Sequence, residues 1–146
     1  MRPDDPATVS SAAEAGRLDE ARAILRSFAP DPQDYRWLYT QCWCLLAAAR
    51  IGDTERVTEL RNQLLPYRRM ACSVSVHVIC GSVAYFTGEA ALALGDADAA
   101  LADLALAIEA DQAMGAGHWL ARARDAFARA QRLKNGTDPV PFTARQ

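Results

Sequence analysis

The stretch over residues 81–114, GSVAYFTGEAALALGDADAALADLALAIEADQAM, decides the fold because it contains two helices joined at a corner. Gly95 follows an apolar run, where a helix commonly ends with a glycine in the left-handed conformation. The carboxylate of Asp96 can then accept free backbone N–H groups at the start of the next helix. Beyond it, alanine and leucine recur at helical spacing and Asp103 falls off their face. This pattern predicts an amphipathic helix with Asp103 on its solvated side.

The same corner recurs twice upstream, which indicates an internal repeat. Gly52 follows LLAAARI, and Gly16 lies in EAGRLDEA. The three glycines are 36 and 43 residues apart, close to the period of about 34 residues in tetratricopeptide repeats. The surplus fits best in the connection over residues 66–74. Before the third corner, Gly88 and Ala91 offer small surfaces against which a partner helix can pack closely.

Several segments give the protein a family resemblance. Gly88, Gly95, Ala100 and Ala107 occupy positions of small residues in tetratricopeptide repeats, and Trp119 lies where the next repeat would begin with tryptophan. The segments LLPYRRM, CGSVAYFTGEAALALGD and AIEADQAMGAGHWLARARDAFARA resemble the C-terminal tetratricopeptide-like repeat region of LuxR/MalT-like bacterial transcriptional regulators, of the kind fused to ATPase or adenylate cyclase. The resemblance covers residues 12–132 and implies a regulatory scaffold.

The sequence also departs from that family. It contains no GxxxxGK[ST] phosphate-binding loop, so the ATPase activity of the family is not carried over. Nothing after Lys134 has the pattern of a DNA-binding helix-turn-helix. The resemblance therefore extends to the repeat region alone.

We predict an all-α fold, a tetratricopeptide-like right-handed solenoid of about seven helices. A single domain spans residues 7–134, between a flexible arm over residues 1–6 and a tail over residues 135–146. The helices are predicted over residues 7–15, 18–28, 33–50, 53–65, 79–94, 97–114 and 116–134. Residues 73–78 alternate with period two and would suit a strand, but no second strand candidate is evident. We expect an extended lead-in to a helix that begins near Val78.

Composition argues against nucleic-acid and membrane partners. The net charge of −2 is too small to attract nucleic acid through overall electrostatics. Residues 70–88 contain no Asp, Glu, Lys or Arg, yet three serines, a histidine, two glycines and a threonine make them too polar for a membrane span. The N-terminus has no apolar targeting core. We expect a cytoplasmic protein.

The four cysteines are expected to be reduced thiols packed as small apolar groups. Cys42 and Cys44 are two residues apart on a helix and point about 200° apart, so they cannot share one metal ion. A zinc site would have to combine the other cysteines with both histidines: Cys72, Cys80, His77 and His118. We predict no metal site and no cofactor. No spacing of Ser, His, Asp or Cys predicts a catalytic group, and the sequence is more readily explained as a binding protein than as an enzyme.

The predicted groove lies on the first helix of each pair, which lines the concave face in repeats of this type. Mapped from the corner glycines, its residues are Tyr39, Cys42, Leu46, Arg50, Ser82, Tyr85, Glu89, Trp119, Arg124 and Phe127. Aromatic rings with a few charges suit a peptide helix or a small molecule.

Charge is distributed unevenly around this groove. Residues 89–111 contain acidic residues and no basic one. The following segment is basic, with Asp125 as its one acidic residue, and contains Arg122, Arg124, Arg129, Arg132 and Lys134. Two interpretations remain open. The two segments are complementary solvated faces of neighbouring helices, or the basic segment receives an acidic partner segment or an anionic ligand.

Three hypotheses of function follow. The first is a non-enzymatic scaffold that binds a protein or peptide segment in bacterial transcriptional regulation or signalling. The alternative is a small-molecule protein, a sensor or biosynthetic enzyme, which a closed apolar cavity of about 300 Å³ or more lined by Tyr85, Trp119 and Cys42 would favour. An open groove would favour the peptide. The third is homo-oligomerisation through apolar end faces left uncovered.

Overall fold

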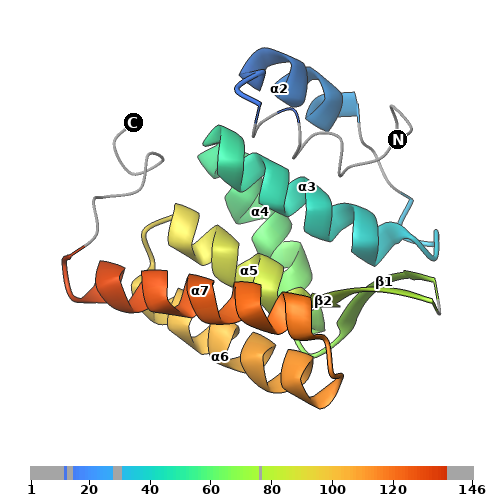
Figure 1. Ribbon diagram of the computed structural model, residues 1–146. Helices are drawn as coiled ribbons and strands as arrows, with labels where there is room; N and C mark the ends of the chain where they lie inside the picture. The colour runs from blue at the N-terminus through green and yellow to red at the C-terminus, as the bar shows by residue number, and fades with distance from the viewer. Residues whose placement is uncertain (1–11, 13–14, 28–30, 76, 138–146) are drawn as a thin grey trace.

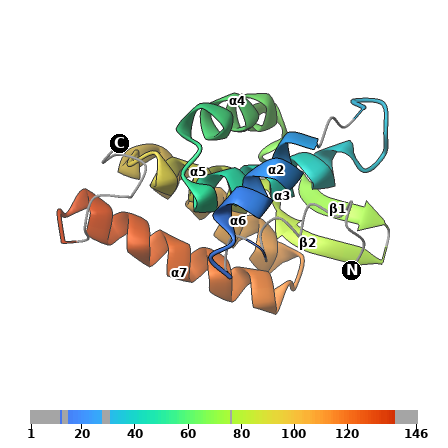
Figure 2. The same cartoon turned by 90° about the horizontal axis from the view of Figure 1, so that it is seen from above.

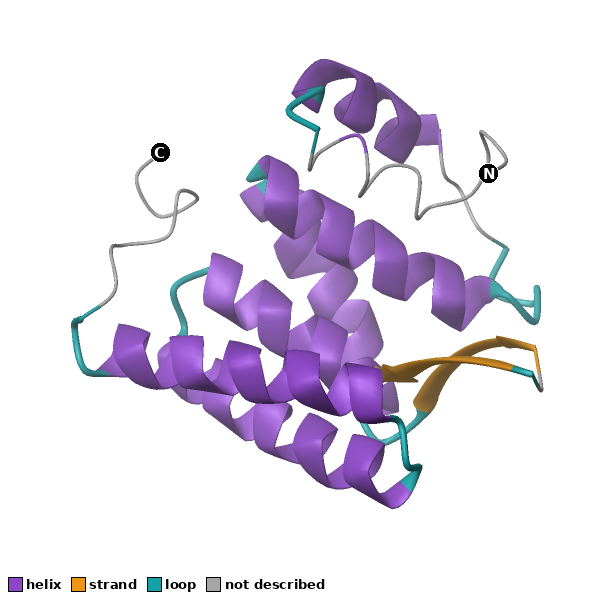
Figure 3. Ribbon diagram, viewed as in Figure 1, coloured by secondary structure: helices purple, strands orange, loops and turns teal. Residues whose placement is uncertain are grey.

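The computed structural model describes residues 12, 15–27, 31–75 and 77–137, and these residues are largely helical (Figures 1 and 3). In sequence order the elements are α2 (Leu18–Ser27), α3 (Trp37–Ile51), α4 (Thr54–Leu64), the short 3₁₀ helix η1 (Leu65–Tyr67), β1 (Ala71–Ser75), β2 (Val78–Ser82), α5 (Val83–Ala93), α6 (Ala97–Ala113) and α7 (Gly117–Lys134). The arm predicted over residues 1–6, most of the helix predicted over residues 7–15 and the tail beyond residue 137 lie outside the described residues.

The helices pack as successive antiparallel neighbours. From α2 to α7, each helix contacts the next one in the sequence, and α3, α5 and α7 also contact one another in that order. Figure 2 shows the same arrangement from above, with α2 over α3 and the strands at one end. The prediction of a mostly helical fold is therefore confirmed, with helix ends shifted by a few residues.

The predicted corner after α5 is present in atomic detail. Gly95 has φ +77°, and the N–H of Asp96 donates to the carbonyl of Ala91 at 2.9 Å. The carboxylate of Asp96 accepts the N–H of Ala99 at 3.0 Å. The corner after α3 repeats both bonds around Gly52, which has φ +75°. These short-range bonds satisfy backbone groups that a helix end leaves free.

The extended conformation predicted before the helix is present in β1, but the expectation that it has no partner strand and leads into a helix near Val78 is wrong, because β1 and β2 pair as antiparallel strands. The strands pair Ala71 with Ser82 and Ser75 with Val78, with irregularities between. Gly81 has φ +72°, which keeps residues 78–82 out of the helix, and a Cβ there would lie 3.0 Å from the side chain of Trp119. The fold is therefore not strictly all-α, and the helix predicted over residues 79–94 begins only at Val83.

The close approach predicted at Gly88 is confirmed. A Cβ on Gly88 would lie 2.6 Å from Cγ of Leu104, so α5 and α6 meet where a side chain is missing. Leu104 is fully buried in this contact. The α5–α6 pair thus packs through a glycine and a leucine, as small-against-large contacts between helices do.

The expectation that Asp103 lies in solvent is wrong. The side chain is 1% exposed, and its two oxygens accept hydrogen bonds from Arg61 and Arg68, each at 2.8 Å. The same arginines also donate through Nε, from Arg61 to the carbonyl of Thr87 at 3.2 Å and from Arg68 to that of Leu65 at 3.1 Å. Asp103 therefore faces α4 and the residue after η1, and an ionic cluster around its buried carboxylate links these segments.

Candidate functional site

Aromatic side chains converge where α3, α5 and α7 meet. Their ring centroids lie 5.3 to 6.2 Å apart in edge-to-face and tilted contacts. The members are Tyr39 and Trp43 of α3, Tyr85 and Phe86 of α5, and Trp119 of α7. Such pairs contribute about 0.5–1.5 kcal/mol each beyond the area that they bury. The cluster fixes the three helices relative to one another and forms a rigid base.

An open pocket of about 560 Å³ lies beside this base. Its lining residues come from the end of α3, from α5 and from α7: Arg50, Tyr85, Glu89, His118, Ala121, Arg122, Asp125 and Arg129. On α7 the spacing of three and four residues between them makes one continuous stripe. Three arginines and two carboxylates surround the aromatic ring of Tyr85, so the pocket combines a charged rim with an apolar wall.

Arg122 lies over the aromatic base. Its guanidinium carbon is 5.4 Å from the ring centroid of Tyr85 and 5.0 Å from that of Trp119, within the range of cation–π attraction. Within the described part of the protein, Arg122 forms no ion pair with a carboxylate. Burial raises the pKa of Tyr85 to about 12, so its hydroxyl stays protonated and can donate.

Arg129 is the ionically paired cation of the rim. Its two terminal nitrogens donate to Glu89, one of them to Oε2 at 3.2 Å, and its Nε donates to Asp125 at 3.2 Å. The hydroxyl of Tyr85 donates to the same Glu89 carboxylate at 3.1 Å. Burial alone would lower the pKa of Arg129, but Glu89 and Asp125 raise it above its ordinary value. The two acidic side chains of the pocket are thus directed at one arginine.

The structure brings together only part of the predicted groove. Arg50, Tyr85 and Glu89 line the pocket. Trp119 lies under it as part of the aromatic base, while Cys42, Leu46 and Ser82 are buried in the core. Tyr39 and Phe127 are half-buried against that core, and Arg124 is exposed outside the pocket.

The groove prediction missed several residues of α7 that line the pocket: His118, Ala121, Arg122, Asp125 and Arg129. Arg122 and Arg129 had entered only as members of the basic segment. The signal that could have found them is helical spacing. Residues three or four apart lie on the same face of a helix, so the other pocket residues share the face of His118, whereas Arg124 lies on a different one. The basic segment also forms pairs with the acidic one, between Arg129 and Glu89 and between Lys134 and Asp98.

The cysteines contribute to the core. Cys42 and Cys44 on α3 and Cys72 on β1 are buried, Cys80 on β2 is half-buried, and none of the four is joined in a disulfide. Burial, with a smaller contribution from the neighbouring Cys72, raises the pKa of Cys42 well above its ordinary value. The expectation of packed thiols is confirmed for the three buried ones. Among the described residues, no three His, Cys, Asp or Glu side chains are grouped so that they could hold a metal ion.

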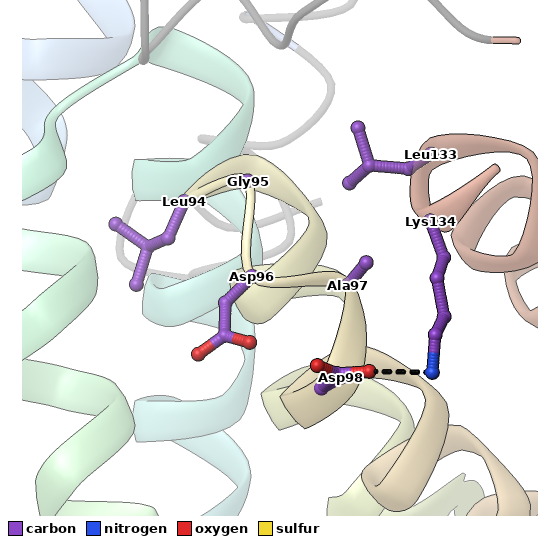
Figure 4. A pocket seen from close by; sticks show the side chains of 7 residues that line it. All are labelled: Leu94, Gly95, Asp96, Ala97, Asp98, Leu133 and Lys134. Atoms are coloured by element: carbon purple, nitrogen blue, oxygen red, sulfur yellow. Dashed lines mark ion pairs between the residues drawn. The ribbon is translucent and has the colours of Figure 1, made fainter. Parts of the chain in front are cut away.

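A second hollow lies between the α5–α6 corner and the end of α7 (Figure 4). Asp96 is used there to cap α6, and Lys134 Nζ pairs with Asp98 at 2.9 Å. Its charged side chains are therefore already engaged, unlike Arg122. The pocket beside the aromatic base is the better candidate for a binding site.

Comparison with known proteins gives no neighbour: no family model, no curated protein and no solved structure matches this sequence. Among the helices that the structure describes, none combines the length and apolar character of a membrane span. Function is therefore inferred from the residues of the pocket.

Proposed function

We propose that the protein is a non-enzymatic, tetratricopeptide-like right-handed solenoid that binds a protein segment in the pocket between α3, α5 and α7. The observation that supports this most directly is the open pocket of about 560 Å³, with a charged rim beside an aromatic base. An open pocket can accept side chains of a peptide that continues across the surface, whereas a small molecule is usually enclosed.

The solenoid part of the proposal is supported by the repeated corners. The same glycine-aspartate turn joins the two helices in each of the pairs α3–α4 and α5–α6. The first helix of each pair, followed by α7, supplies the pocket residues. In helical repeats this is the arrangement that presents a continuous surface to a partner.

We further propose that this binding occurs in bacterial transcriptional regulation or signalling in the cytoplasm, without direct contact to nucleic acid. The support is the resemblance of residues 64–70, 80–96 and 107–130 to the repeat region of LuxR/MalT-like regulators. The net charge of −2 gives no general attraction for nucleic acid.

The small-molecule alternative has less support from the pocket. It required a closed cavity lined by Tyr85, Trp119 and Cys42. The pocket that contains Tyr85 is open and its rim is charged, and Cys42 lies in the core. Homo-oligomerisation is a separate alternative, which light scattering over a range of protein concentrations would detect as a mass that rises with concentration.

Filling the pocket tests the proposed function. Ala121 is exposed and lines the pocket, so Ala121→Trp obstructs it without touching the core. Ala105→Trp, exposed on α6 outside the pocket, is the matched control. Twelve-residue peptides selected from a random library on the wild-type protein should bind Ala121→Trp about tenfold more weakly or worse and the control unchanged. Equal binding to all three proteins, or no selected peptide with an intact fold, would contradict the proposal.

A further inference from the structure

We infer that the partner segment is acidic and that one of its carboxylates is held by Arg122. This inference rests on the proposed function, because it names the chemistry of the segment that enters the pocket. The carboxylate is that of an Asp or Glu side chain of the partner segment. Three observations support it: the pairing of the pocket carboxylates with Arg129 and not with Arg122, the contacts of Arg122 with aromatic rings, and the position of the two acidic side chains.

The carboxylates of the pocket are not paired with Arg122. The lining contains Glu89 and Asp125 beside Arg122 and Arg129. Both carboxylates are directed at Arg129, through Glu89 on one side and Asp125 on the other. Among the described residues no carboxylate pairs with Arg122, so an incoming group with a single negative charge would meet a cation that the pocket does not already neutralise.

The contacts of Arg122 prepare it for a carboxylate. Its guanidinium lies over Tyr85 and Trp119, and rings on one face restrict the plane of the group. An arginine held in this way loses little freedom when it donates two parallel hydrogen bonds to one carboxylate. Within the described residues it has no ion-pair partner to give up.

The two acidic side chains favour a carboxylate over a phosphate group. A phosphomonoester carries a charge of about −1.5 to −2 at neutral pH and would approach Glu89 and Asp125 in the same pocket. Both carboxylates would repel the incoming anion, and this repulsion grows with the negative charge that the anion carries. A carboxylate adds only a single negative charge, which one guanidinium group can pair, and a basic segment would be repelled by Arg122.

Three peptide libraries test the inference. Each contains acetylated twelve-residue peptides attached through the C-terminus and otherwise random, with every third position fixed as Glu, Gln or Lys. They are selected on the wild-type protein, on Arg122→Gln and on Arg124→Gln. Arg124 lies on the same helix but is exposed outside the pocket, so its variant makes the same charge change. Peptides from the Glu library should be enriched on the wild type and on Arg124→Gln, and about tenfold less on Arg122→Gln.

The outcomes separate the inference from the proposed function. Selection of Gln or Lys peptides that Ala121→Trp no longer binds would overturn the acidic partner and leave the groove function standing. No selected peptide from any library, with all proteins folded, would overturn both. Glu peptides that bind Arg122→Gln and Arg124→Gln equally would overturn the role of Arg122.

Two further arms identify the anion. Three versions of the best Glu peptide are synthesised. The first keeps Glu and has an amidated C-terminus, the second replaces Glu by Gln and is also amidated, and the third has Gln and a free C-terminal carboxylate. If the second peptide does not bind and the third does, a terminal carboxylate is sufficient for binding. If neither binds, the side-chain carboxylate is required. Displacement by inorganic phosphate but not by acetate at equal ionic strength would overturn the preference for a carboxylate. If Arg122→Gln does not fold, Arg122→Lys keeps the charge and should still weaken binding several-fold, because lysine lacks the planar pair of donors.

Discussion

Two buried carboxylates on α6 show how much a single position depends on its neighbours. Asp103 and Asp111 are both about 1% exposed or less. Asp103 accepts bonds from Arg61 and Arg68 at 2.8 Å, whereas neither carboxylate oxygen of Asp111 has a well-formed hydrogen bond in the described structure. The same residue type is therefore stabilised by ion pairs at one position and buried without them at the other. A separate prediction follows for each position.

Removing the carboxylate of Asp103 should strongly destabilise the fold. In Asp103→Ala the guanidinium group of Arg61 loses its ionic partner while it stays mostly buried, so we expect the free energy of unfolding to fall by about 3 kcal/mol. Urea unfolding followed by circular dichroism measures this. Asp98→Ala, which removes an exposed partner of Lys134, should change stability by less than about 0.5 kcal/mol. Equal effects of the two substitutions would refute the role of the buried cluster.

Asp111 should make stability depend on pH. Burial raises the pKa of its carboxyl to about 6, although the nearby N–H of Ser82 acts in the opposite direction. Because the folded-state pKa lies above the ordinary value of 3.8, the folded protein retains a proton between about pH 4 and 6 that the unfolded protein has lost. The contribution of this group is therefore greatest below pH 4 and is lost as pH rises through 6.

Asp111→Asn should consequently be more stable than the wild type at pH 7, by about 1–3 kcal/mol, and the difference should shrink toward pH 4. Thermal unfolding between pH 4 and 8 measures it. Glu109→Gln, an exposed change on the same helix, serves as the control. A wild type and Asp111→Asn variant with parallel pH profiles would show that this carboxyl does not titrate as described.

At the scale of elements, each helix pair depends on a corner and on a close contact. The corners at Gly52 and Gly95 are closed by bonds between residues at most five apart, so the local sequence suffices to predict them. The contact at Gly88 is also signalled by a small residue beside apolar ones. The hairpin is signalled locally only in β1, where the sequence alternates with period two. The strand β2 is recognisable only through its pairing with β1 and the packing of Trp119 on Gly81.

Gly88→Ala should weaken the α5–α6 pair. The new methyl group would lie 2.6 Å from Cγ and 2.8 Å from Cδ2 of Leu104, and this overpacking of a buried side chain should cost about 1–3 kcal/mol. The gain of about 0.5–1 kcal/mol from replacing a helical glycine offsets only part of it. Gly117→Ala at the start of α7, where a Cβ meets nothing within 4 Å, should be neutral or slightly stabilising in the same unfolding measurement. A Gly88→Ala protein as stable as the control would contradict the close packing.

On the scale of the whole molecule, three thiols are protected by the packed helices and the hairpin together. Burial raises the pKa of Cys44 to about 12 and that of Cys42 well above its ordinary value. A buried, protonated thiol is a poor nucleophile. At pH 8 an aromatic disulfide reagent should therefore modify only Cys80 rapidly, and the buried thiols only as the protein unfolds.

The modified residues can be assigned by mass spectrometry after short reaction times. Denatured protein, in which all four cysteines react together, gives the reference rate. Rapid reaction of Cys42, Cys44 or Cys72 in the native protein would show that the core is open around them.

The sequence by itself determined the features that depend on neighbours a few residues away. Gly52, Gly95 and their following aspartates specify helix ends, Gly88 specifies a close contact, and apolar residues at helical spacing indicate helices. Of the predicted groove residues, Arg50, Tyr85 and Glu89 line one pocket, and binding of a partner there stays a prediction.

Only the tertiary structure decided which polar residues are buried, which strand pairs and which arginine of α7 faces the aromatic base. Arg61 and Asp103 are 42 residues apart and Glu89 and Arg129 are 40 apart, and no local pattern relates them. The rotation of α7 also decides that Arg122 lines the pocket and Arg124 does not. The physical reason is that burial and ion pairing depend on how separate helices pack, while helix ends depend on backbone bonds within a single turn.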